Sequence, residues 1–225
     1  MNKLLYFLCP LFLWCQPLPN WEVYKSNILK IQKTIPGWCS LPQADMLLDF
    51  IHEHKPFLCV EIGTFAGSTT FPIVAALFYN QTGQLYAIDA WDQQTALEGL
   101  KMDDPNAIGW SRLNIHWEQV HQILLQWVQD LELKPFCYPV QMRSEEAVSL
   151  FLEDSIDFLF LDGNFSENGS KKDVELYFPK VKKGGFIWLN RADILTKSAS
   201  VGFLMKQCKW VRELSMGAQC IVFQK

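Results

Sequence analysis

Residues 58–70, which read LCVEIGTFAGSTT, constrain the fold of this chain more than any other segment. An apolar run ends there in Glu61, and Gly63 and Gly67 follow where the backbone must turn tightly. Glycine allows a backbone angle that a side chain forbids, and it lets an incoming helix pack closely. The pattern predicts a buried strand that turns directly into a helix. Any tight strand-to-helix turn uses glycine, so the turn alone leaves its ligand open.

A second apolar run, residues 85–89, also ends in an acid, Asp89. Ligands of open parallel sheets bind beyond the carboxyl ends of the strands, where Glu61 and Asp89 would lie side by side. A carboxylate at this place can accept both hydroxyls of a ribose. The spacing Glu-x-Gly-x-x-x-Gly, with Thr64 after the first glycine, differs from the Gly-x-Gly-x-x-Gly of dinucleotide-binding turns. The sequence therefore favours a nucleoside over a dinucleotide.

The rest of the chain alternates between strand and helix patterns. Strands are predicted at residues 57–62, 84–89, 136–141, 156–161 and 185–189, with a final hairpin of residues 209–214 and 220–224 around the loop 215–218. Helices are predicted at residues 21–35, 44–54, 68–78, 113–131, 145–153 and 169–178. Near-continuous apolar runs suit strands that are buried on both faces. This order predicts an α/β fold with a doubly wound, mostly parallel sheet of seven strands.

Residues 90–110 lack a clear period, and the sequence Asp-Asp-Pro-Asn at 103–106 is typical of a turn. Long irregular insertions in compact domains are often lids over an active site. Trp91 follows Asp89 by two positions, so we expect it to border a bound adenine or the substrate. Trp117 lies in a predicted helix, where packing against the sheet is the better explanation.

Length and composition indicate one domain, residues 20–225, after an apolar N-terminal segment, residues 1–19. The chain has 225 residues, of which 49% are apolar, enough for one substantial core. Its net charge of -4 gives no general attraction to nucleic acid, so we expect no nucleic-acid partner. The seven cysteines are spread along the chain without a CxxC pair, which argues against a disulfide framework or a zinc site.

The N-terminal segment supports two interpretations. Residues 4–14 are apolar and follow Lys3, as in a signal peptide or a membrane anchor, but an ordinary spanning helix needs about 20 residues and Pro10 interrupts the run. The alternative is an arm that packs on the domain or on a second copy of the chain in a homodimer. An arm is compatible with a cytoplasmic protein, whereas a signal or anchor implies export or contact with a membrane.

Several motifs occur together in a known order. Residues 61–68 resemble the first motif of class I S-adenosylmethionine-dependent methyltransferases, in particular the small-molecule O-methyltransferase branch. The same branch has an Asp-Gly at the end of a later strand, then Lys-Lys-Asp on a helix and Lys-x-Gly-Gly before a strand. This chain has Asp162-Gly163, the run 171–173 and the run 182–185. The resemblance covers roughly residues 40–225 and implies a sheet whose last strand is antiparallel.

The resemblance implies S-adenosyl-L-methionine as cofactor and a small molecule as methyl acceptor. Carried over position by position, it places the cofactor against Glu61, Gly63, Thr64, Gly67, Ser68, Asp89, Ala90, Trp91, Ser144, Glu145 and Asp162. In this assignment Ser144 and Glu145 meet the adenine edge. They also fit a helix N-terminus with an acid in its first turn, and the sequence leaves both explanations open.

The acceptor half of the family pattern is altered. In the metal-dependent members, an Asp after the fourth strand and acids after the fifth hold a divalent cation, and Asp162 matches the first of these ligands. The branch commonly continues Asp-Gly-Asp-His, where this chain has Asn164 and Phe165, and the fifth strand ends in Asn190 and Arg191. A fixed positive charge there repels a cation by several kcal/mol even at an effective dielectric constant of ~20. We therefore predict that no metal is bound.

Asp162 and Arg191 are the catalytic candidates that remain. Arg191 either orients an anionic acceptor such as a carboxylate, which its planar guanidinium suits, or pairs with Asp162 and closes an unused site. The first alternative predicts a methyltransferase, which transfers the methyl group to an oxygen of a small polar or anionic acceptor without a metal. The second predicts a non-catalytic methyltransferase-fold protein that binds a nucleoside ligand or a protein partner.

Overall fold

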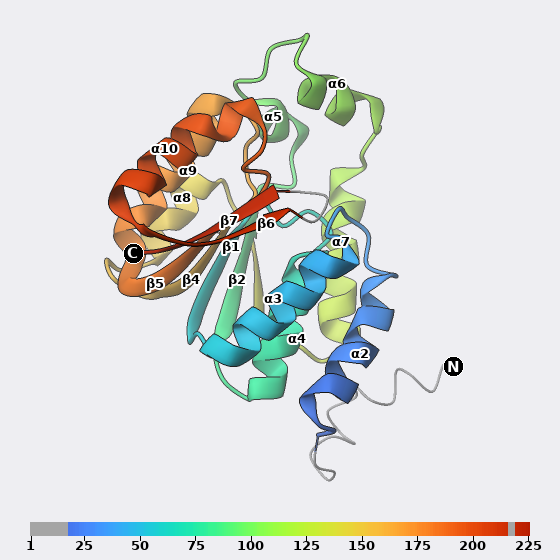
Figure 1. Ribbon diagram of the computed structural model, residues 1–225. Helices are drawn as coiled ribbons and strands as arrows, with labels where there is room; N and C mark the ends of the chain where they lie inside the picture. The colour runs from blue at the N-terminus through green and yellow to red at the C-terminus, as the bar shows by residue number, and fades with distance from the viewer. Residues whose placement is uncertain (1–17, 216–218) are drawn as a thin grey trace.

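The computed structural model describes residues 18–215 and 219–225, in which helices cover both faces of a central sheet (Figure 1). The seven strands lie in the order β3-β2-β1-β4-β5-β7-β6. Strand β7 is antiparallel to both of its neighbours, and all other pairs are parallel. The strands are β1 (Leu58–Ile62), β2 (Gln84–Asp89), β3 (Cys137–Gln141), β4 (Ile156–Leu161), β5 (Val181–Leu189), β6 (Lys209–Ser215) and β7 (Gln219–Gln224). The predicted doubly wound sheet with an antiparallel last strand is confirmed.

The helices form two layers and a cap. Helices α2, α3, α4 and α7 pack on one face of the sheet, and α8, α9 and α10 pack on the other. Helices α5 and α6 lie beyond the strand ends, at the top of Figure 1. The helices are α2 (Trp21–Gln32), α3 (Leu41–His54), α4 (Thr70–Asn80), α5 (Gln93–Leu97), α6 (Pro105–Arg112), α7 (Trp117–Asp130), α8 (Ser144–Ala147), α9 (Glu167–Tyr177) and α10 (Ser198–Gln207).

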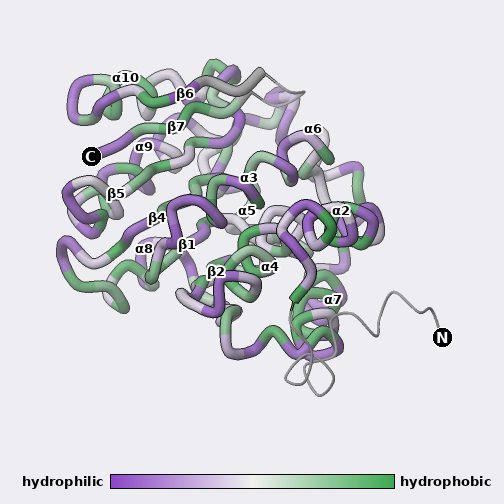
Figure 2. The backbone as a smooth tube through the Cα atoms, turned by 60° about the horizontal axis from the view of Figure 1, so that its bottom comes forward, coloured by the Kyte–Doolittle hydropathy of each residue, from purple (hydrophilic) through white to green (hydrophobic). Residues whose placement is uncertain are grey.

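Alternation along each strand divides the core between the two layers. In β4, Phe158 and Phe160 pack with the α2–α3–α4–α7 layer, while Leu159 and Leu161 pack with the opposite layer. Both faces of the strand are therefore buried, which explains its uninterrupted apolar sequence. Figure 2 shows hydrophobic and hydrophilic residues interspersed along the covering helices, as expected for helices with one face on a core.

Short polar side chains cap the N-termini of three of the covering helices. The side chains of Asn20, Ser40 and Ser166 accept hydrogen bonds from backbone N–H groups in the first turns of α2, α3 and α9. Each satisfies a donor that the helix itself leaves unpaired. These caps place the helix starts at fixed positions relative to the sheet.

The turn after β1 requires glycine for two different reasons. Gly63 has φ +86°, and a Cβ atom there would lie 2.3 Å from the carbonyl oxygen of Asp162. Gly67 has φ +90°, and a Cβ atom there would lie 2.5 Å from the Trp127 ring on α7. The predicted need for glycine at both positions is confirmed, although the neighbour of Gly67 is a core tryptophan. The first glycine brings the tips of β1 and β4 together.

Several predicted boundaries were wrong. The segment 90–110 contains α5 and most of α6, and the single helix predicted at 113–131 begins at Trp117. The helix predicted at 145–153 ends at Ala147 and continues only as a 3-10 turn to Leu150. Helix α10 was missed, because its sequence SASVGFLMKQ has a weak apolar period and a central glycine.

Two predictions fall outside the described residues, namely the apolar run 4–14 and residues 216–218 of the loop in the last hairpin. The membrane contact and the dimer arm predicted from the run 4–14 therefore stay predictions. Within residues 18–215 and 219–225, no helix is both long enough and apolar enough to cross a bilayer.

Gly63→Ala should destabilise the domain much more than Gly184→Ala. Both glycines have nearly the same left-handed backbone, φ +86° and φ +85°, but a Cβ atom at position 184 would meet nothing within 4 Å. We expect a loss of about 1–2 kcal/mol for Gly184→Ala from the backbone alone, and at least about 2 kcal/mol more for Gly63→Ala from the clash with β4. Urea unfolding measures both. Equal losses of stability in the two variants would show that a Cβ atom at position 63 does not clash with the end of β4.

Candidate functional site

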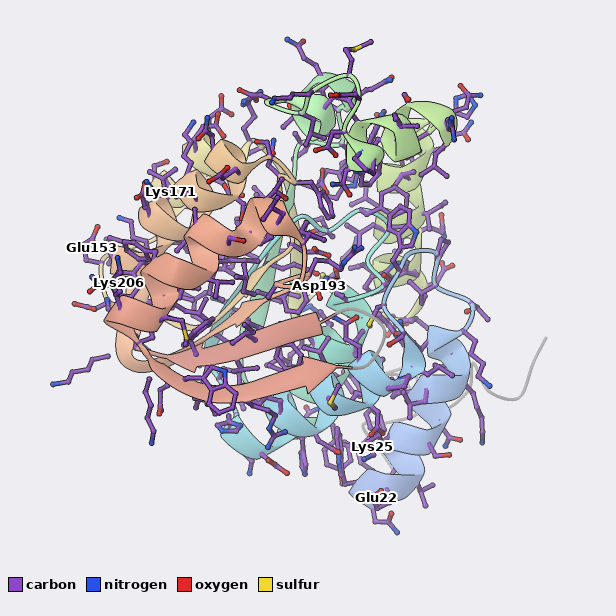
Figure 3. The ribbon with its side chains drawn as sticks, turned by 45° about the horizontal axis from the view of Figure 1, so that its top comes forward. Glu22, Lys25, Glu153, Lys171, Asp193 and Lys206 are labelled. Carbon is purple, nitrogen blue, oxygen red and sulfur yellow. The ribbon has the colours of Figure 1, made fainter. Side chains whose placement is uncertain are left out.

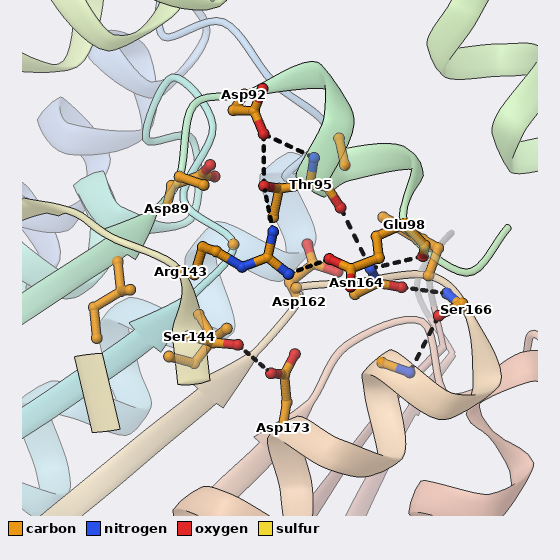
Figure 4. Close-up of a pocket in the computed structure, with 18 of the residues that line it drawn as sticks. Asp89, Asp92, Thr95, Glu98, Arg143, Ser144, Asp162, Asn164, Ser166 and Asp173 are labelled. Carbon is orange, nitrogen blue, oxygen red and sulfur yellow. Dashed lines mark hydrogen bonds and ion pairs between the residues drawn. The ribbon is translucent and has the colours of Figure 1, made fainter. Parts of the chain in front are cut away.

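A cavity of about 400 Å³ opens at the carboxyl ends of β1, β2, β3 and β4 (Figure 4). Its position is the one that parallel sheets offer to ligands. The cavity brings together several of the residues predicted from the sequence: Gly63, Asp89, Ala90, Ser144, Glu145 and Asp162. These residues come from four separate loops, so the fold assembles the site.

The carboxylate of Asp89 joins the ends of β1 and β2. Its Oδ2 accepts hydrogen bonds from the backbone N–H groups of Thr64 (3.0 Å) and Phe65 (2.9 Å), and its Oδ1 accepts one from that of Trp91 (2.8 Å). Burial raises the pKa of Asp89 in spite of these three bonds, which favour the charged form. Asp89 therefore fixes the glycine turn while its side chain borders the cavity.

Glu61 takes a different place from the one predicted. On β1, the side chain of Glu61 points the same way as that of Cys59, toward the α2–α3–α4–α7 layer, and it is fully buried. Both carboxyl oxygens accept hydrogen bonds from hydroxyls at the start of α4, those of Thr69 and Thr70. Burial raises the pKa of Glu61 to about 8. Glu61 is absent from the residues that line the cavity, and it ties β1 to α4 instead.

Trp91 also lies away from the cavity. Its ring is buried, donates a hydrogen bond from Nε1 to the carbonyl oxygen of Phe65 (2.8 Å), and stacks on His121 at 4.0 Å between ring centroids. The expectation that Trp91 borders an adenine is not matched by its side-chain position. The backbone N–H of Trp91, which holds Asp89, is its contribution to the site.

Ser144 and Glu145 both line the cavity from the loop after β3. The Ser144 hydroxyl donates to Asp173, and the Glu145 carboxylate accepts from Nε of Arg143 at 2.9 Å. Arg143, not Ser144, occupies the N-cap position of α8, and it forms no side-chain cap. Ser144 is therefore not the N-cap, but Glu145 is an acid in the first turn of α8, as the helix explanation predicted, and both residues also line the cavity. Their contact with an adenine stays a prediction.

Two residues tie α5 to the sheet across the cavity (Figure 4). Arg143 donates to the Thr95 hydroxyl at 3.2 Å and forms an ion pair with Glu98. Asn164 donates from Nδ2 to the carbonyl oxygens of Glu98 (3.0 Å) and Thr95 (3.4 Å), and its Oδ1 accepts from the N–H of Ser166 (2.7 Å). A carboxylate cannot donate to a carbonyl oxygen, so the amide at position 164 is what permits this contact.

A second cavity of about 370 Å³ adjoins the first and shares Gly63, Asp162 and four aromatic residues with it. Thr64 and Ser68 line it, together with Asn190 and Arg191 from the end of β5. The four shared aromatic rings are those of Trp38, Phe65, Trp110 and Phe165; Trp110 contacts the other three at 5.3 to 6.3 Å between centroids, and Trp38 contacts Phe65 at 4.7 Å. The second cavity thus has an aromatic side and a polar end.

Arg191 lies at this polar end with a left-handed backbone, φ 52°. Its ion pair is with Asp193, at 3.6 Å between Nε and Oδ1, and Asp162 is not within ion-pair distance of it among the described residues. The buried Nε has no hydrogen-bond partner in the described part of the chain. The second alternative for Arg191, closure of the site by pairing with Asp162, is not what the side chains form.

The protein-family comparison matches residues 60–190, more than half of the chain, to a family described as a methyltransferase domain. The matched segment contains the glycine turn, Asp89 and Asp162. The chain belongs to this methyltransferase family. The resemblance to class I methyltransferases that the sequence motifs indicated is confirmed. No curated protein matches the methyltransferase in sequence.

Solved structures share the fold of this chain. An O-methyltransferase from Bacillus cereus in complex with SAH is 12% identical, with a TM-score of 0.61 over 93% of each chain. The O-methyltransferase NovP is 12% identical, with a TM-score of 0.65 over 92% of this chain and 99% of its own. The O-methyltransferase TomG from Streptomyces achromogenes, in complex with SAM, is 10% identical, with a TM-score of 0.59 over 90% and 89%.

Sequence reasoning missed Lys197, which lies between β5 and α10 of this chain. Its side chain is buried, and its ammonium lies 5.5 Å from the ring centroid of Phe165. Burial lowers the pKa of Lys197, while the neighbouring carboxylates of Asp162 and Asp173 oppose that shift. Burial raises the pKa of Asp162 to about 6, and Lys197, Asn190 and Arg191 counteract this rise. No sequence signal pointed to Lys197, because its segment has no regular period.

No group of three His, Cys, Asp or Glu side chains in residues 18–215 and 219–225 lies close enough together to hold a metal ion. The nearest match to the family's metal ligands, Asp162, has Asn190 beside it in place of a second acid. Amide and carboxylate oxygens can both bind hard cations, but the two positive side chains around Asp162 disfavour a further positive charge. Metal independence stays a prediction.

Glu61→Gln should flatten the dependence of stability on pH. The folded chain keeps a proton on Glu61 up to a pKa of about 8, whereas the unfolded chain releases it near pH ~4.3. The contribution of Glu61 therefore lowers the free energy of unfolding as pH rises through this window, by up to about 5 kcal/mol. Glutamine cannot ionise and should remove that slope.

Urea unfolding at pH 5.5 and pH 8 tests this expectation, with Glu118→Gln on the exposed side of α7 as the control. Asp162 titrates in both the wild type and Glu61→Gln, so its contribution to the pH dependence of stability cancels when the two slopes are compared. Identical pH slopes in the wild type and Glu61→Gln would contradict a raised pKa at this position.

Lys197→Met should destabilise the domain, because it leaves two buried carboxylates without their ammonium neighbour. Breaking a buried charge pair in this way costs about 3–5 kcal/mol. We expect the loss to be largest near pH 8 and smaller near pH 5, where Asp162 and Asp173 can take up protons. Chemical denaturation measures it against Lys171→Met, whose side chain is half exposed and lies on the outer side of α9 (Figure 3). A loss as small as that of Lys171→Met would show that the buried charge is dispensable.

Proposed function

We propose that the chain is an S-adenosylmethionine-dependent methyltransferase that transfers the methyl group to an oxygen of a small acceptor without a divalent metal. The charge of the first cavity is the observation that carries this proposal. Acidic residues outnumber basic ones there: Asp89, Asp92, Glu98, Glu145, Asp162 and Asp173 against Arg143 and Lys172. S-adenosylmethionine carries a sulfonium and an ammonium against one carboxylate, so it is complementary to an acidic cavity.

The residues around the cavity suggest how the cofactor would lie. Asp89, at the tip of β2, is the acid nearest to where the ribose hydroxyls are expected, and Ser144 and Met142 border the region for the adenine. The reacting methyl group would then face Asp162, which lines both cavities. The acceptor would enter the second cavity from the side of the aromatic rings. The O-methyltransferases with the same fold support this assignment, since one binds SAH and another SAM.

Methyl transfer from a sulfonium is a direct displacement, and alignment of donor and acceptor contributes more than covalent catalysis does. The glycine turn held by Asp89 and the loops tied by Arg143 are rigid parts that could provide this alignment. Arg191 and Lys197 supply positive charge near Asp162, where metal-dependent relatives use a cation. The proposal therefore includes metal independence.

Ala90→Phe should weaken cofactor binding strongly, because Ala90 lines the first cavity and a phenyl ring would occupy part of it. Isothermal titration calorimetry with S-adenosylhomocysteine should give micromolar affinity for the wild type and at least a tenfold loss for the variant. Leu195→Phe is the matched control, since Leu195 is 85% exposed and outside both cavities. No binding by the wild type would refute the proposal, and a rate of methyl transfer that falls in EDTA would refute its metal-free part.

A further inference from the structure

We propose that the acceptor group is the carboxylate of a small aromatic acid, so that the product is a methyl ester. This inference rests on the proposed function and specifies the acceptor of the same site. Three features of the second cavity carry it: the aromatic walls that it shares with the first, the guanidinium at its polar end, and the lack, among the described residues, of a suitable proton acceptor beside Asp162.

The walls of the second cavity fit a flat apolar body. Trp38 is 61% exposed although its ring contacts Phe65 at 4.7 Å and Trp110 at 5.3 Å between centroids. Phe165 closes the opposite side, 6.3 Å from Trp110. Aromatic rings prefer stacked or edge-on contacts at 4.5–7 Å, so a further ring inserted here would gain about 0.5–1.5 kcal/mol per contact beyond its burial.

The polar end of the second cavity fits an anion. Arg191 carries a planar guanidinium, which binds carboxylates with two parallel hydrogen bonds. Its Nε is buried without a hydrogen-bond partner among the described residues, and its loose ion pair with Asp193 leaves donors for a ligand. The negative charge of Asp162 would repel an anion, but the positive charge of Lys197 offsets it and Asn190 forms a hydrogen bond with the carboxylate.

The titratable groups that face this cavity are poor proton acceptors for an alcohol or a phenol. They are Asp162, Arg191 and Cys39, with Lys197 behind Phe165. Burial raises the pKa of the Cys39 thiol, so it is protonated at neutral pH. Asp162 has a pKa of about 6, and a phenol has one of about 10, so proton transfer between them is unfavourable by about four orders of magnitude. A carboxylic acid is already ionised at neutral pH and needs no base.

The reaction balances without an additional reactant. A carboxylate oxygen uses a lone pair to form the new C–O bond to the methyl carbon. The bond between that carbon and sulfur breaks, and its electron pair stays on sulfur as the neutral thioether of S-adenosylhomocysteine. No proton is released. One negative and one positive charge are neutralised, so the step needs no group that stabilises a developing charge.

A product assay distinguishes a methyl ester from a methyl ether. Wild-type protein is incubated with methyl-labelled S-adenosylmethionine and benzoate, phenylacetate or cinnamate, and in parallel with phenol, benzyl alcohol or cinnamyl alcohol. We expect label in the acids only, and mild alkali should release it as volatile methanol because esters hydrolyse. Alkali-stable label, label in the phenol or alcohols, or no label with any acid would overturn the proposal.

Arg191→Gln tests the role of the guanidinium. The substitution should lower kcat/KM for the best acid by at least about 100-fold, while calorimetry with S-adenosylhomocysteine should show an affinity within twofold of the wild type. Arg112→Gln, an exposed arginine at the end of α6, should change neither. Weaker binding of S-adenosylhomocysteine by Arg191→Gln would show that Arg191 serves the cofactor, and the proposal would be wrong. No cofactor binding by the wild type would instead refute the methyltransferase itself.

Discussion

The bonds between the Asp89 carboxylate and the backbone of the glycine turn are the interaction on which the site depends. They join the tips of β1 and β2, and the same turn meets β4 because Gly63 leaves no side chain between them. Three strand ends are thus fixed by one carboxylate and one missing Cβ atom. The first cavity lies against this junction, so backbone contacts set its base, while the side chains of Arg143 and Asn164 hold α5 across it.

The two cavities differ in charge, and the proposed binding places of the methyl donor and the acceptor follow from that difference. The first is acidic and suits a cationic donor, while Arg191 lines only the second, which suits an anionic acceptor; the aromatic rings line both. Asp162 borders both and is surrounded by Asn190, Arg191 and Lys197. A pair of reactants with opposite charges would therefore be drawn to opposite sides of the residue at which they meet.

The sequence predicted the sheet well, and it placed Gly63 and Asp89 at the strand ends where a cavity lies, because long apolar strands and a glycine turn are local signals. Asp89 and Gly63 follow directly from that pattern. It predicted the side chains around them less well: Glu61 lies in the same motif but faces α4, since strand alternation turns it away from the cavity. Lys197 and the Asn164 contacts with α5 were missed because they depend on segments distant in sequence.

The buried Glu61 also changes how the folded molecule exchanges protons with its solvent. The formal net charge of -4 counts Glu61 as ionised, but with a pKa of about 8 it is mostly neutral in the folded chain at pH 7. Unfolding near pH 7 therefore releases about one proton from this residue. The heat of unfolding measured by calorimetry includes the heat with which the buffer takes up that proton, and it differs between phosphate and Tris for the same protein.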